Sequence, residues 1–372
     1  MNPALMLKNA LLALAASAAY LFRSKAIGVP QRVLVVQGGK MGDMICTTPL
    51  LRALKQGLPG SHLAVMGDKL NGDILAGNPR LDEYIVRPGS VLTFARRARE
   101  GNFDTALVTG PDTEALLALL LARVPVVVAP RITNGWSPYE TKTYLLMTRF
   151  VRTMPHAMGA YAPREYLRLL EPLGIHTGDT RKELVVAPEA VASAEEKLFH
   201  AGVREGERLI GLAPSVGNKV KRWGGEKFAR VANTLGKRRG ARIVILDGKM
   251  ADLETEAMRS ALSPELPVAD LAGKLSVEEL KAVIRKLSLF ISVDTGPIYI
   301  AEAFGIPTVD IVGPMDENEQ PPRGGKHRVV VPEREKPMLH IMNASVFDWG
   351  EARRQAEAIL PEMVIREAES LL

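Results

Sequence analysis

Short apolar runs rich in β-branched residues alternate with longer amphipathic stretches from about residue 30 to residue 320. Parallel strands joined by helices are buried on both faces and therefore appear as continuous apolar runs, so this alternation predicts βαβ units. The expected strands of the first half are Arg32–Gln37, His62–Met66, Tyr84–Val86, Thr105–Thr109 and Val126–Ala129. Those of the second half are Leu209–Leu212, Arg242–Leu246, Leu289–Val293 and Thr308–Val312.

The amphipathic stretches between these strands predict the helices. They are Pro49–Gln56, Leu92–Glu100, Glu114–Ala122, Tyr166–Leu173, Pro188–Ala201, Glu226–Arg238 and Ala251–Leu262. A capping box, Ser276 to Glu279, opens a further helix that runs to about Lys286. The last stretch, Trp349–Leu371, is amphipathic and interrupted by Pro361, whereas residues 131–163 are irregular and predict a long loop.

The fold class is therefore α/β, with two consecutive Rossmann-like domains. A chain of 372 residues is too long for one ordinary core. We expect an apolar and basic N-terminal segment over residues 1–29, a first domain over 30–180, a second domain over 181–345 and a C-terminal helical segment over 346–372.

The charge is unevenly distributed. The net charge is +6, and the first 42 residues carry five cations and no acid, which leaves +1 for the rest of the chain. Because the body is nearly neutral and has few aromatic residues among its cations, nucleic acid is not an expected partner. A single cysteine, Cys46, excludes an internal disulfide framework and any multi-cysteine metal cluster.

The run Ala10–Phe22 is uncharged, with Arg23 and Lys25 directly after it. It is shorter than the roughly 20 residues that a bilayer crossing needs, and the order of charges is unlike that of a cleaved signal peptide. The pattern favours a helix that lies in the membrane interface, with its cations on anionic lipid. A spanning anchor, a cleaved signal and a helix packed on the globular body remain alternatives. We expect peripheral association with the cytoplasmic face of a membrane.

The first candidate site lies at the carboxyl end of the strand Arg32–Gln37, where open α/β sheets bind ligands. Gly38, Gly39 and Gly42 allow a tight turn around Lys40, and Asp43 follows. Asp43 is suited to act as a general base on a hydroxyl group, and it is equally suited to cap a helix. The sequence Thr47-Thr48-Pro49 predicts an N-cap with proline at the first helical position.

Two more candidate loops follow strands of the second domain. The loop 213–223 contains Ser215, Lys219 and Lys221, which could bind phosphate or form an ordinary basic surface loop. Asp294-Thr295-Gly296 opens a helix, whose N-terminus suits a diphosphate; the alternative is a capped core helix. The chain lacks a Walker A motif, HExxH, CxxC and an Asp-x-Asp pair, and its histidines have no ligand spacing. We therefore expect no metal and no cofactor, with phosphate bound by N–H groups and cations.

Taken together, these loops resemble those of glycosyltransferase family 9, the ADP-heptose:lipopolysaccharide heptosyltransferases of Gram-negative bacteria. The similarity extends in order over about residues 30–320. It is carried by RVLVVQGGKMGDMICTTPLLRALKQGLPGS, AGNPRLDEYI, EYLRLLEPLGI, IGLAPSVGNKVKRWGGEKFARVAN, LAGKLSVEELKAVI and LFISVDTGPIYIAEAFGIPTVDIVGPMD. The resemblance implies a GT-B fold, with parallel sheets facing an inter-domain cleft and a C-terminal helix returning to the first domain. It also implies inverting, metal-independent transfer from a nucleotide sugar, ADP-heptose, to a glycolipid acceptor at the inner membrane.

The resemblance also assigns residues. Asp43 would be the catalytic base, within an acceptor-side loop of Gly38, Gly39, Lys40 and Gly42. The donor nucleotide and its phosphates would be bound by Ser215, Lys221, Glu254, Asp294, Thr295, Gly296 and Tyr299. Two departures stand out: Tyr299 occupies the place of a usual histidine, and Gly38-Gly39-Lys40 that of a usual serine or arginine. They leave two alternatives, a family 9 enzyme for another nucleotide sugar and surface polysaccharide, or a membrane-associated nucleotide-binding scaffold that has lost turnover.

Overall fold

The computed structural model describes residues 28–248, 253–343 and 348–372. These residues form two compact units. Unit 1 comprises residues 28–72, 78–181 and 341–343, and unit 2 comprises residues 73–77, 182–248, 253–340 and 348–372. The expected membrane-associating segment lies almost entirely outside the described residues. None of the helices in the described ranges is long and apolar enough to cross a bilayer.

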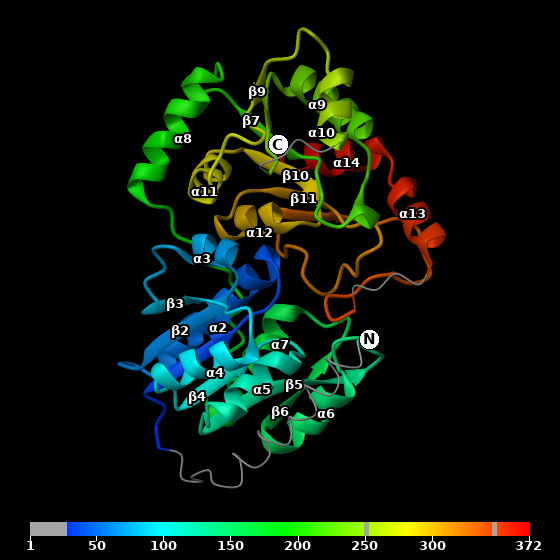
Figure 1. Ribbon diagram of the computed structural model, residues 1–372. Coiled ribbons are helices and arrows are strands. Elements are labelled where there is room, and N and C mark those ends of the chain that lie inside the picture. The colour runs from blue at the N-terminus through cyan, green and yellow to red at the C-terminus, as the bar shows by residue number, and fades with distance from the viewer. Residues whose placement is uncertain (1–27, 249–252, 344–347) are drawn as a thin grey trace. The chain divides into compact units, whose positions relative to one another are not determined.

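Unit 1 is built on a parallel six-stranded sheet with the strand order β3-β2-β1-β4-β5-β6 (Figure 1). The central strand β1 pairs with β2 through Val33 and Leu63, and with β4 through Val33 and Thr105. All five strands expected here are confirmed. The strands are β1 (Arg32–Val36), β2 (His62–Gly67), β3 (Glu83–Val86), β4 (Thr105–Val108), β5 (Val126–Asn134) and β6 (Arg152–Ala157).

Helices cover both faces of this sheet because successive strand residues point to opposite faces and both sets are apolar. Leu34 and Val36 of β1 pack in one core with α4 and α5, whereas the equally buried Val33 and Val35 face the side of α2 and α7. The helices are α2 (Met41–Gly57), α3 (Lys69–Leu75), α4 (Val91–Glu100), α5 (Thr113–Leu121), α6 (Lys142–Met147) and α7 (Ala162–Arg168), with 3₁₀ turns at Thr148–Phe150 and Glu171–Leu173.

Unit 2 repeats the same arrangement, with the strand order β12-β11-β10-β7-β8-β9 and all neighbours parallel. The four strands expected here are again confirmed, and two short edge strands are added. The strands are β7 (Leu209–Ala213), β8 (Arg242–Ile245), β9 (Val268–Asp270), β10 (Leu289–Val293), β11 (Thr308–Ile311) and β12 (His327–Val330). The α/β class with two parallel sheets is thus confirmed.

The helices of unit 2 also lie on both faces of its sheet. Helices α9, α10 and α14 share a core with Ile291 and Val293 of β10, while α8, α11 and α12 pack together on the opposite face. The helices are α8 (Pro188–His200), α9 (Gly225–Arg239), α10 (Leu253–Ala261), α11 (Val277–Arg285), α12 (Gly296–Ala303), α13 (Trp349–Ala358) and α14 (Pro361–Glu369), with a 3₁₀ turn at Lys219–Lys221. The capping box of α11 is confirmed by the bond from Glu279 N to Ser276 Oγ at 3.3 Å.

The expected return of a C-terminal helix to the first domain is wrong for the described helices. Both α13 and α14 belong to unit 2, and α14 packs against α9, β11 and β12. The reason is the apolar stripe Val364, Ile365 and Ala368, which is buried in the core of the second sheet. Of the described residues after 182, only 341–343 belong to unit 1.

Helix α2 begins at Met41, eight residues before the expected start at Pro49. The expected N-cap Thr47-Thr48-Pro49 is therefore wrong, because these residues lie in the helix interior. Pro49 has no N–H to donate to the carbonyl of Ile45. The hydroxyl of Thr48 donates to that carbonyl instead, at 2.8 Å, and so replaces the missing bond of the helix.

Residues 131–163, expected to form a long loop, instead contain the end of β5, helix α6 and the edge strand β6. Strand β6 contains Pro155 and is half exposed, so it lacks the apolar run that marks the buried strands. Helix α6 is short and is capped by Thr141, whose hydroxyl accepts from Tyr144 N at 3.0 Å. Its buried residues Tyr144 and Met147 attach it to the core under α5.

Gly225, at the start of α9, is expected to tolerate no side chain. An added Cβ would lie 2.0 Å from the carbonyl oxygen of Glu254 and 2.7 Å from Met258 N, and neither backbone atom can rotate away. Gly225→Ala should therefore lower the free energy of unfolding by about 1–3 kcal/mol. Gly89→Ala is the matched control, because no atom lies within 4 Å of its added Cβ. Equal denaturation midpoints for the two variants would contradict this packing.

Candidate active site

Both sheets have the strand order of a doubly wound fold, in which the direction of winding changes between two neighbouring strands. The change lies between β1 and β4 in unit 1 and between β7 and β10 in unit 2. Ligands of open α/β sheets bind at the carboxyl ends of these strands. The three predicted loops follow β1, β7 and β10. Each sheet therefore places predicted residues where its topology opens a crevice.

In unit 1, Asp43 is the third residue of α2 and is half-buried. Its Oδ2 accepts a hydrogen bond from the backbone N–H of Lys40 at 2.8 Å, as a capping carboxylate does. An added Cβ on Gly39 would lie 2.4 Å from the same oxygen, so only glycine permits this approach. Asp43 thus has the helix-capping role that the sequence allowed, and its carboxylate has a fixed position at the carboxyl edge of the sheet.

Neighbouring polar side chains hold the glycine turn in place. Gln37 is buried; its Oε1 accepts from Gly39 N at 2.8 Å and its Nε2 donates to Thr47 Oγ1 at 2.8 Å. Asn71, from α3, is fully buried and donates to the carbonyl of Gly39 at 2.9 Å. Lys40 and Gly38 are exposed, whereas Gly42 is buried inside the first turn of α2. The turn is therefore a braced structure that presents Lys40 to solvent.

In unit 2, the loops after β7 and β10 meet. Lys221 donates from Nζ to Asp294 Oδ2 at 2.7 Å and to the carbonyl oxygen of Asp294 at 3.0 Å. Asp294 is buried, with 2% of its surface exposed, and its Oδ1 accepts from the hydroxyl of Tyr299. We call Lys221, Asp294 and Tyr299 the unit 2 cluster. It brings together three of the predicted donor-site residues.

The unit 2 cluster lies at the start of α12. Thr295 is the N-cap and its side chain makes no capping bond, Gly296 is the first helical residue, and Pro297 follows. The first N–H groups of a helix have no partner within the helix and carry partial positive charge. The side chain of Tyr299 is buried, and its hydroxyl donates a hydrogen bond to Asp294 Oδ1. The Nζ atom of Lys182 lies 5.7 Å from the centroid of the Tyr299 ring.

The two remaining predicted donor residues serve neighbouring loops of unit 2. Ser215 donates from its hydroxyl to Asp247, which also accepts from the buried Thr255 and, at 2.6 Å, from Gly248 N. Glu254 Oε2 accepts from Gly225 N at 2.6 Å and so holds the start of α9. The hydrogen bonds shown here link neither residue directly to the unit 2 cluster.

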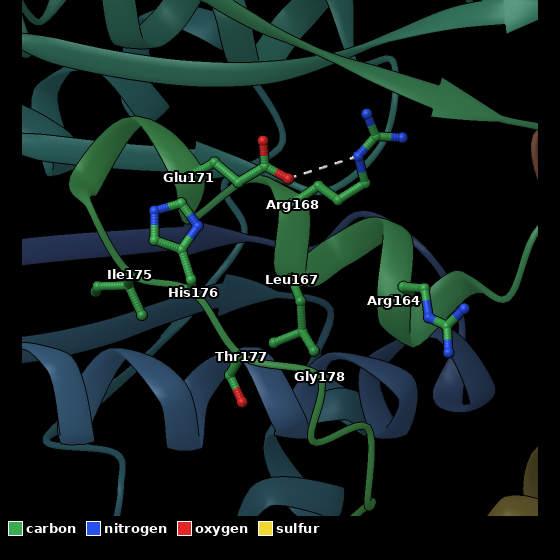
Figure 2. Close-up of a pocket in the computed structure, with 8 residues that line it drawn as sticks. All are labelled: Arg164, Leu167, Arg168, Glu171, Ile175, His176, Thr177 and Gly178. Atoms are coloured by element: carbon green, nitrogen blue, oxygen red, sulfur yellow. Dashed lines mark ion pairs between the residues drawn. The ribbon is translucent and has the colours of Figure 1, made fainter.

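Unit 1 also has a surface hollow of about 560 Å³ between α7 and the segment that follows it (Figure 2). Arg168 pairs there with Glu171 at 3.7 Å and with Glu165 at 3.4 Å. None of the predicted site residues lines it. The lining residues are Arg164, Leu167, Arg168, Glu171, Ile175, His176, Thr177 and Gly178.

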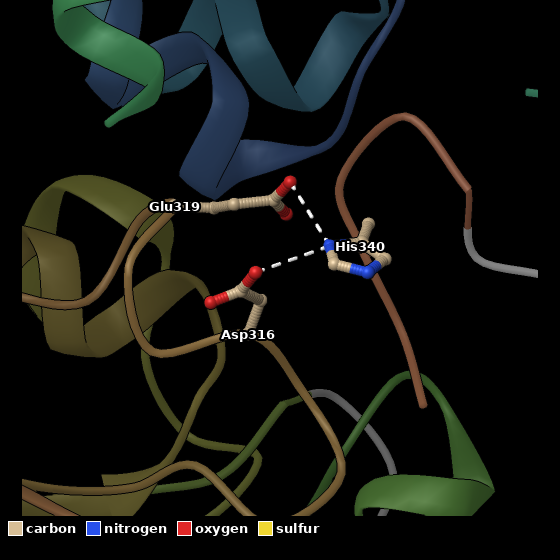
Figure 3. A group of neighbouring side chains, drawn as sticks. All are labelled: Asp316, Glu319 and His340. Atoms are coloured by element: carbon tan, nitrogen blue, oxygen red, sulfur yellow. Dashed lines mark hydrogen bonds and ion pairs between the residues drawn. The ribbon is translucent and has the colours of Figure 1, made fainter. Parts of the chain in front are cut away.

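Among the described residues, Asp316, Glu319 and His340 bring three possible metal-ligand atoms within 4.8 Å of one another (Figure 3). His340 Nδ1 lies 3.2 Å from Asp316 Oδ2 and 3.2 Å from Glu319 Oε1. The hydrogen bond to Asp316, followed by that to Glu319, raises the pKa of His340 to about 9. The imidazolium is therefore itself the cation between two buried carboxylates at neutral pH.

This ion cluster predicts a loss of stability at alkaline pH. Because the pKa of His340 is raised in the folded state, its contribution is complete below about pH 6.5 and disappears as the pH rises through about 9. In His340→Asn, the side-chain amide N–H can still donate a hydrogen bond, but the positive charge of the imidazolium is lost. It should cost on the order of 2–3 kcal/mol of unfolding free energy at pH 6 and almost nothing at pH 10. Denaturant unfolding at both pH values measures this. The exposed His176, changed to Asn, is the control, and equal costs at both pH values would contradict the assignment.

Several residues of these sites were not predicted from the sequence. Gln37 and Asn71 brace the first loop, and Asp247 joins Ser215 to Thr255. Asp310 lies in the middle of β11, next to the unit 2 cluster. The available signal was a carboxylate between the apolar residues Val309 and Ile311 of an expected strand, because a buried carboxylate is costly unless it is paired or keeps its proton.

The sequence matches glycosyltransferase family 9 (heptosyltransferase) over residues 91–345. It is 27% identical to lipopolysaccharide heptosyltransferase 3 of Escherichia coli K12 over 286 residues, which cover 74% of this chain and 80% of that protein. Lipopolysaccharide heptosyltransferase 2 of the same strain is 24% identical over 315 residues, covering 80% and 87%.

Solved structures agree in fold. A family 9 glycosyltransferase from Veillonella parvula superposes with a TM-score of 0.75 at 24% identity, over 93% of this chain and 98% of that chain. The ADP-heptose lipopolysaccharide heptosyltransferase II of E. coli has a TM-score of 0.70 at 20% identity, over 91% and 98%. The expected GT-B type of fold is thereby confirmed. With more than half of its length matched to the family, this chain belongs to glycosyltransferase family 9 and is a glycosyltransferase.

Proposed function

We propose that the protein transfers heptose from ADP-heptose to a lipopolysaccharide core or a related glycolipid, with inversion and without a metal ion. The observation that carries the proposal is the pairing of Lys221 with Asp294 at the start of α12, at the switch point of the second sheet. The relatives named above are lipopolysaccharide heptosyltransferases, which supports both the donor and the acceptor class.

In this proposal unit 2 binds the donor. The ammonium group of Lys221 and the N–H groups at Thr295 and Gly296 would bind the diphosphate, since a cation and a helix N-terminus both favour an anion. Asp294 and Tyr299 would fix the position of Lys221. Ser215 would add a hydroxyl at the same edge of the sheet. Glu254, which anchors the start of α9, would lie toward the nucleotide or its sugar.

Unit 1 would supply the base and bind the acceptor through the Gly38–Gly42 turn. Asp43 would take the proton of the acceptor hydroxyl, whose oxygen attacks the anomeric carbon from the face opposite the diphosphate. The bond from that carbon to the diphosphate oxygen breaks, and its electron pair leaves with the diphosphate, next to Lys221. An ordinary carboxylate is a weak base. The rate therefore depends on fixed positions and on stabilisation of the leaving group's charge.

We further propose that the enzyme works at the cytoplasmic face of the inner membrane, bound through residues 1–28. A variant lacking these residues should stay in the supernatant when anionic vesicles are sedimented at moderate salt, whereas the full chain should sediment. The reason is the loss of the apolar run 10–22 and of Lys8, Arg23 and Lys25. Each cation near an anionic surface contributes about 1 kcal/mol. Sedimentation of the truncated protein would contradict the anchor.

A panel of ADP-, UDP- and GDP-sugars tests the donor. With a glycolipid extract as acceptor, we expect acceptor-dependent release of ADP from ADP-heptose. Release of UDP or GDP instead would establish the second candidate, a family 9 enzyme for another nucleotide sugar. That candidate is favoured by Tyr299, which occupies the usual histidine position and donates a hydrogen bond from its hydroxyl to Asp294. Nucleotide binding without release of ADP, UDP or GDP would contradict both of these donor assignments.

A further inference from the structure

A third buried carboxylate lies beside the unit 2 cluster. Asp310 is in β11, directly opposite Ser292 of β10, and its surface is completely buried. Its neighbours Val309 and Ile311 face the core with α9 and α14, so Asp310 points to the other face, which α12 covers. Neither of its carboxyl oxygens has a hydrogen-bond partner among the described residues.

The two lysines that face Asp310 are each already paired with another carboxylate. Lys221 is paired with Asp294 at 2.7 Å, and Lys182, whose side chain is fully buried, is paired with Glu302 at 2.6 Å. Among the charged groups of the described chain that face Asp310, two cations are therefore each paired with a carboxylate, and an ionised Asp310 would be a further anion.

The groups that face Asp310 come from every element packed around it. Asp294 follows β10, Lys221 lies in the loop after β7, and Glu302 lies on α12. Lys182, from the segment before α8, completes the charged neighbours. His327 lies on β12, and its Nδ1 forms a hydrogen bond of 2.8 Å with Thr308 Oγ1. Burial lowers the pKa of this histidine.

We propose that Asp310 is a positioning residue of the donor site, held as a neutral carboxylic acid so that Lys221 stays paired with Asp294 at the carboxyl edge of the sheet. This inference rests on the proposed function, in which Lys221 binds the donor diphosphate. An ionised Asp310 would offer Lys221 a second, deeper carboxylate. It would also add a negative charge beneath the place where the diphosphate binds.

Physical chemistry supports the neutral form. A carboxylate without hydrogen bonds or a counter-ion is costly to bury, so the group keeps its proton instead. Burial, followed by the nearby charge of Asp294, raises the pKa of Asp310 well above its usual range. The unfolded chain loses this proton near pH 4, so above that pH folding takes a proton up for as long as buried Asp310 stays neutral. Asp310 should thus lower stability as the pH rises.

The first test compares unfolding of the wild-type chain and of Asp310→Asn in denaturant between pH 5 and pH 8, without ligand. Relative to Asp310→Asn, the unfolding equilibrium constant of the wild type should rise by about tenfold per pH unit until Asp310 itself ionises. Asp310→Ala is the second variant. It leaves a cavity and lowers stability at every pH, but its pH dependence should follow that of Asp310→Asn. Parallel curves for all three proteins would overturn the inference.

The second test measures ADP affinity by calorimetry on the same proteins across pH 6–9. At pH 6 the wild type and Asp310→Asn should bind ADP within about twofold of each other. At pH values above the end of that tenfold rise, where Asp310 ionises in the folded protein, the wild type should lose affinity relative to the variant by about threefold or more, because only the wild type gains the buried charge. Changes in the protonation of ADP with pH affect both proteins equally, so they cancel in the ratio of the two affinities.

The outcomes separate the two claims. If Asp310 ionises in the folded protein and the wild type still binds ADP with the same pH dependence as Asp310→Asn, the positioning role is wrong and the proposed function stands. If the wild type binds none of ADP, UDP and GDP, the proposed function fails and the positioning role fails with it.

Discussion

Lys221→Ala is expected to reduce kcat/KM for the nucleotide-sugar donor by about 10²–10³-fold, the loss typical of removing one group that stabilises developing charge. Lys221 is the cation at the switch point of the second sheet, bonded to both the side chain and the carbonyl of Asp294. In the proposed mechanism, its loss would remove the positive charge that stabilises the leaving diphosphate. Steady-state kinetics with a varied donor concentration measure the effect.

The same substitution has a second consequence, because it leaves the buried Asp294 without its ion pair. Breaking a buried pair costs about 3–5 kcal/mol of unfolding free energy. The double variant Lys221→Ala/Asp294→Asn removes the stranded charge, so it should regain most of the stability and none of the activity. Lys219→Ala is the matched control, since this exposed lysine lies two residues away on the same turn. Equal losses of activity in Lys219→Ala and Lys221→Ala would contradict the assignment of Lys221.

Asp43→Asn is expected to lower kcat by about 10²–10⁴-fold, the range of a general base, while ADP affinity stays within about twofold. The asparagine oxygen can still accept from Lys40 N, as Asp43 Oδ2 does at 2.8 Å. The N-cap and the glycine turn therefore persist, and the loss of activity reports the lost proton acceptor.

The control for this variant is another capping carboxylate of unit 1. Asp68 follows β2, accepts from Asn71 N at 2.9 Å and is exposed, so Asp68→Asn makes the same chemical change at the start of α3. We expect it to keep nearly full activity. An Asp43→Asn enzyme that turns over at the wild-type rate would show that Asp43 is a helix cap and nothing more.

The buried strands could be predicted from the sequence because each is a short apolar run flanked by turns. Of the edge strands, β3 was predicted, but β6, β9 and β12 were not: β6 contains Pro155 and is half exposed, and β9 has three residues. The start of α2 was misplaced for a different reason. Two glycines before Lys40 indicate a turn, and Pro49 indicates a helix start, whereas the hydroxyl of Thr48 allows the proline inside the helix.

The loops predicted as sites follow β1, β7 and β10, and the topology brings them to the switch points, whereas Glu254, assigned through the family resemblance, lies at the start of α10. Sequence order cannot show which of them touch. The bond from Tyr299 to Asp294 and the pairing of the two lysines near Asp310 with other carboxylates both depend on neighbouring strands and on α12. Such contacts are set by strand order and register, which belong to the tertiary structure and cannot be read from the sequence alone.

The measurement that tests the central claim most directly is made on the glycolipid product. The full-length protein is incubated with ADP-heptose and a glycolipid acceptor, and the product is analysed by mass spectrometry and by NMR of the new anomeric centre. We predict the addition of one heptose in the configuration opposite to that of the donor. An unchanged acceptor, or a heptose attached with the donor's configuration retained, would contradict the account.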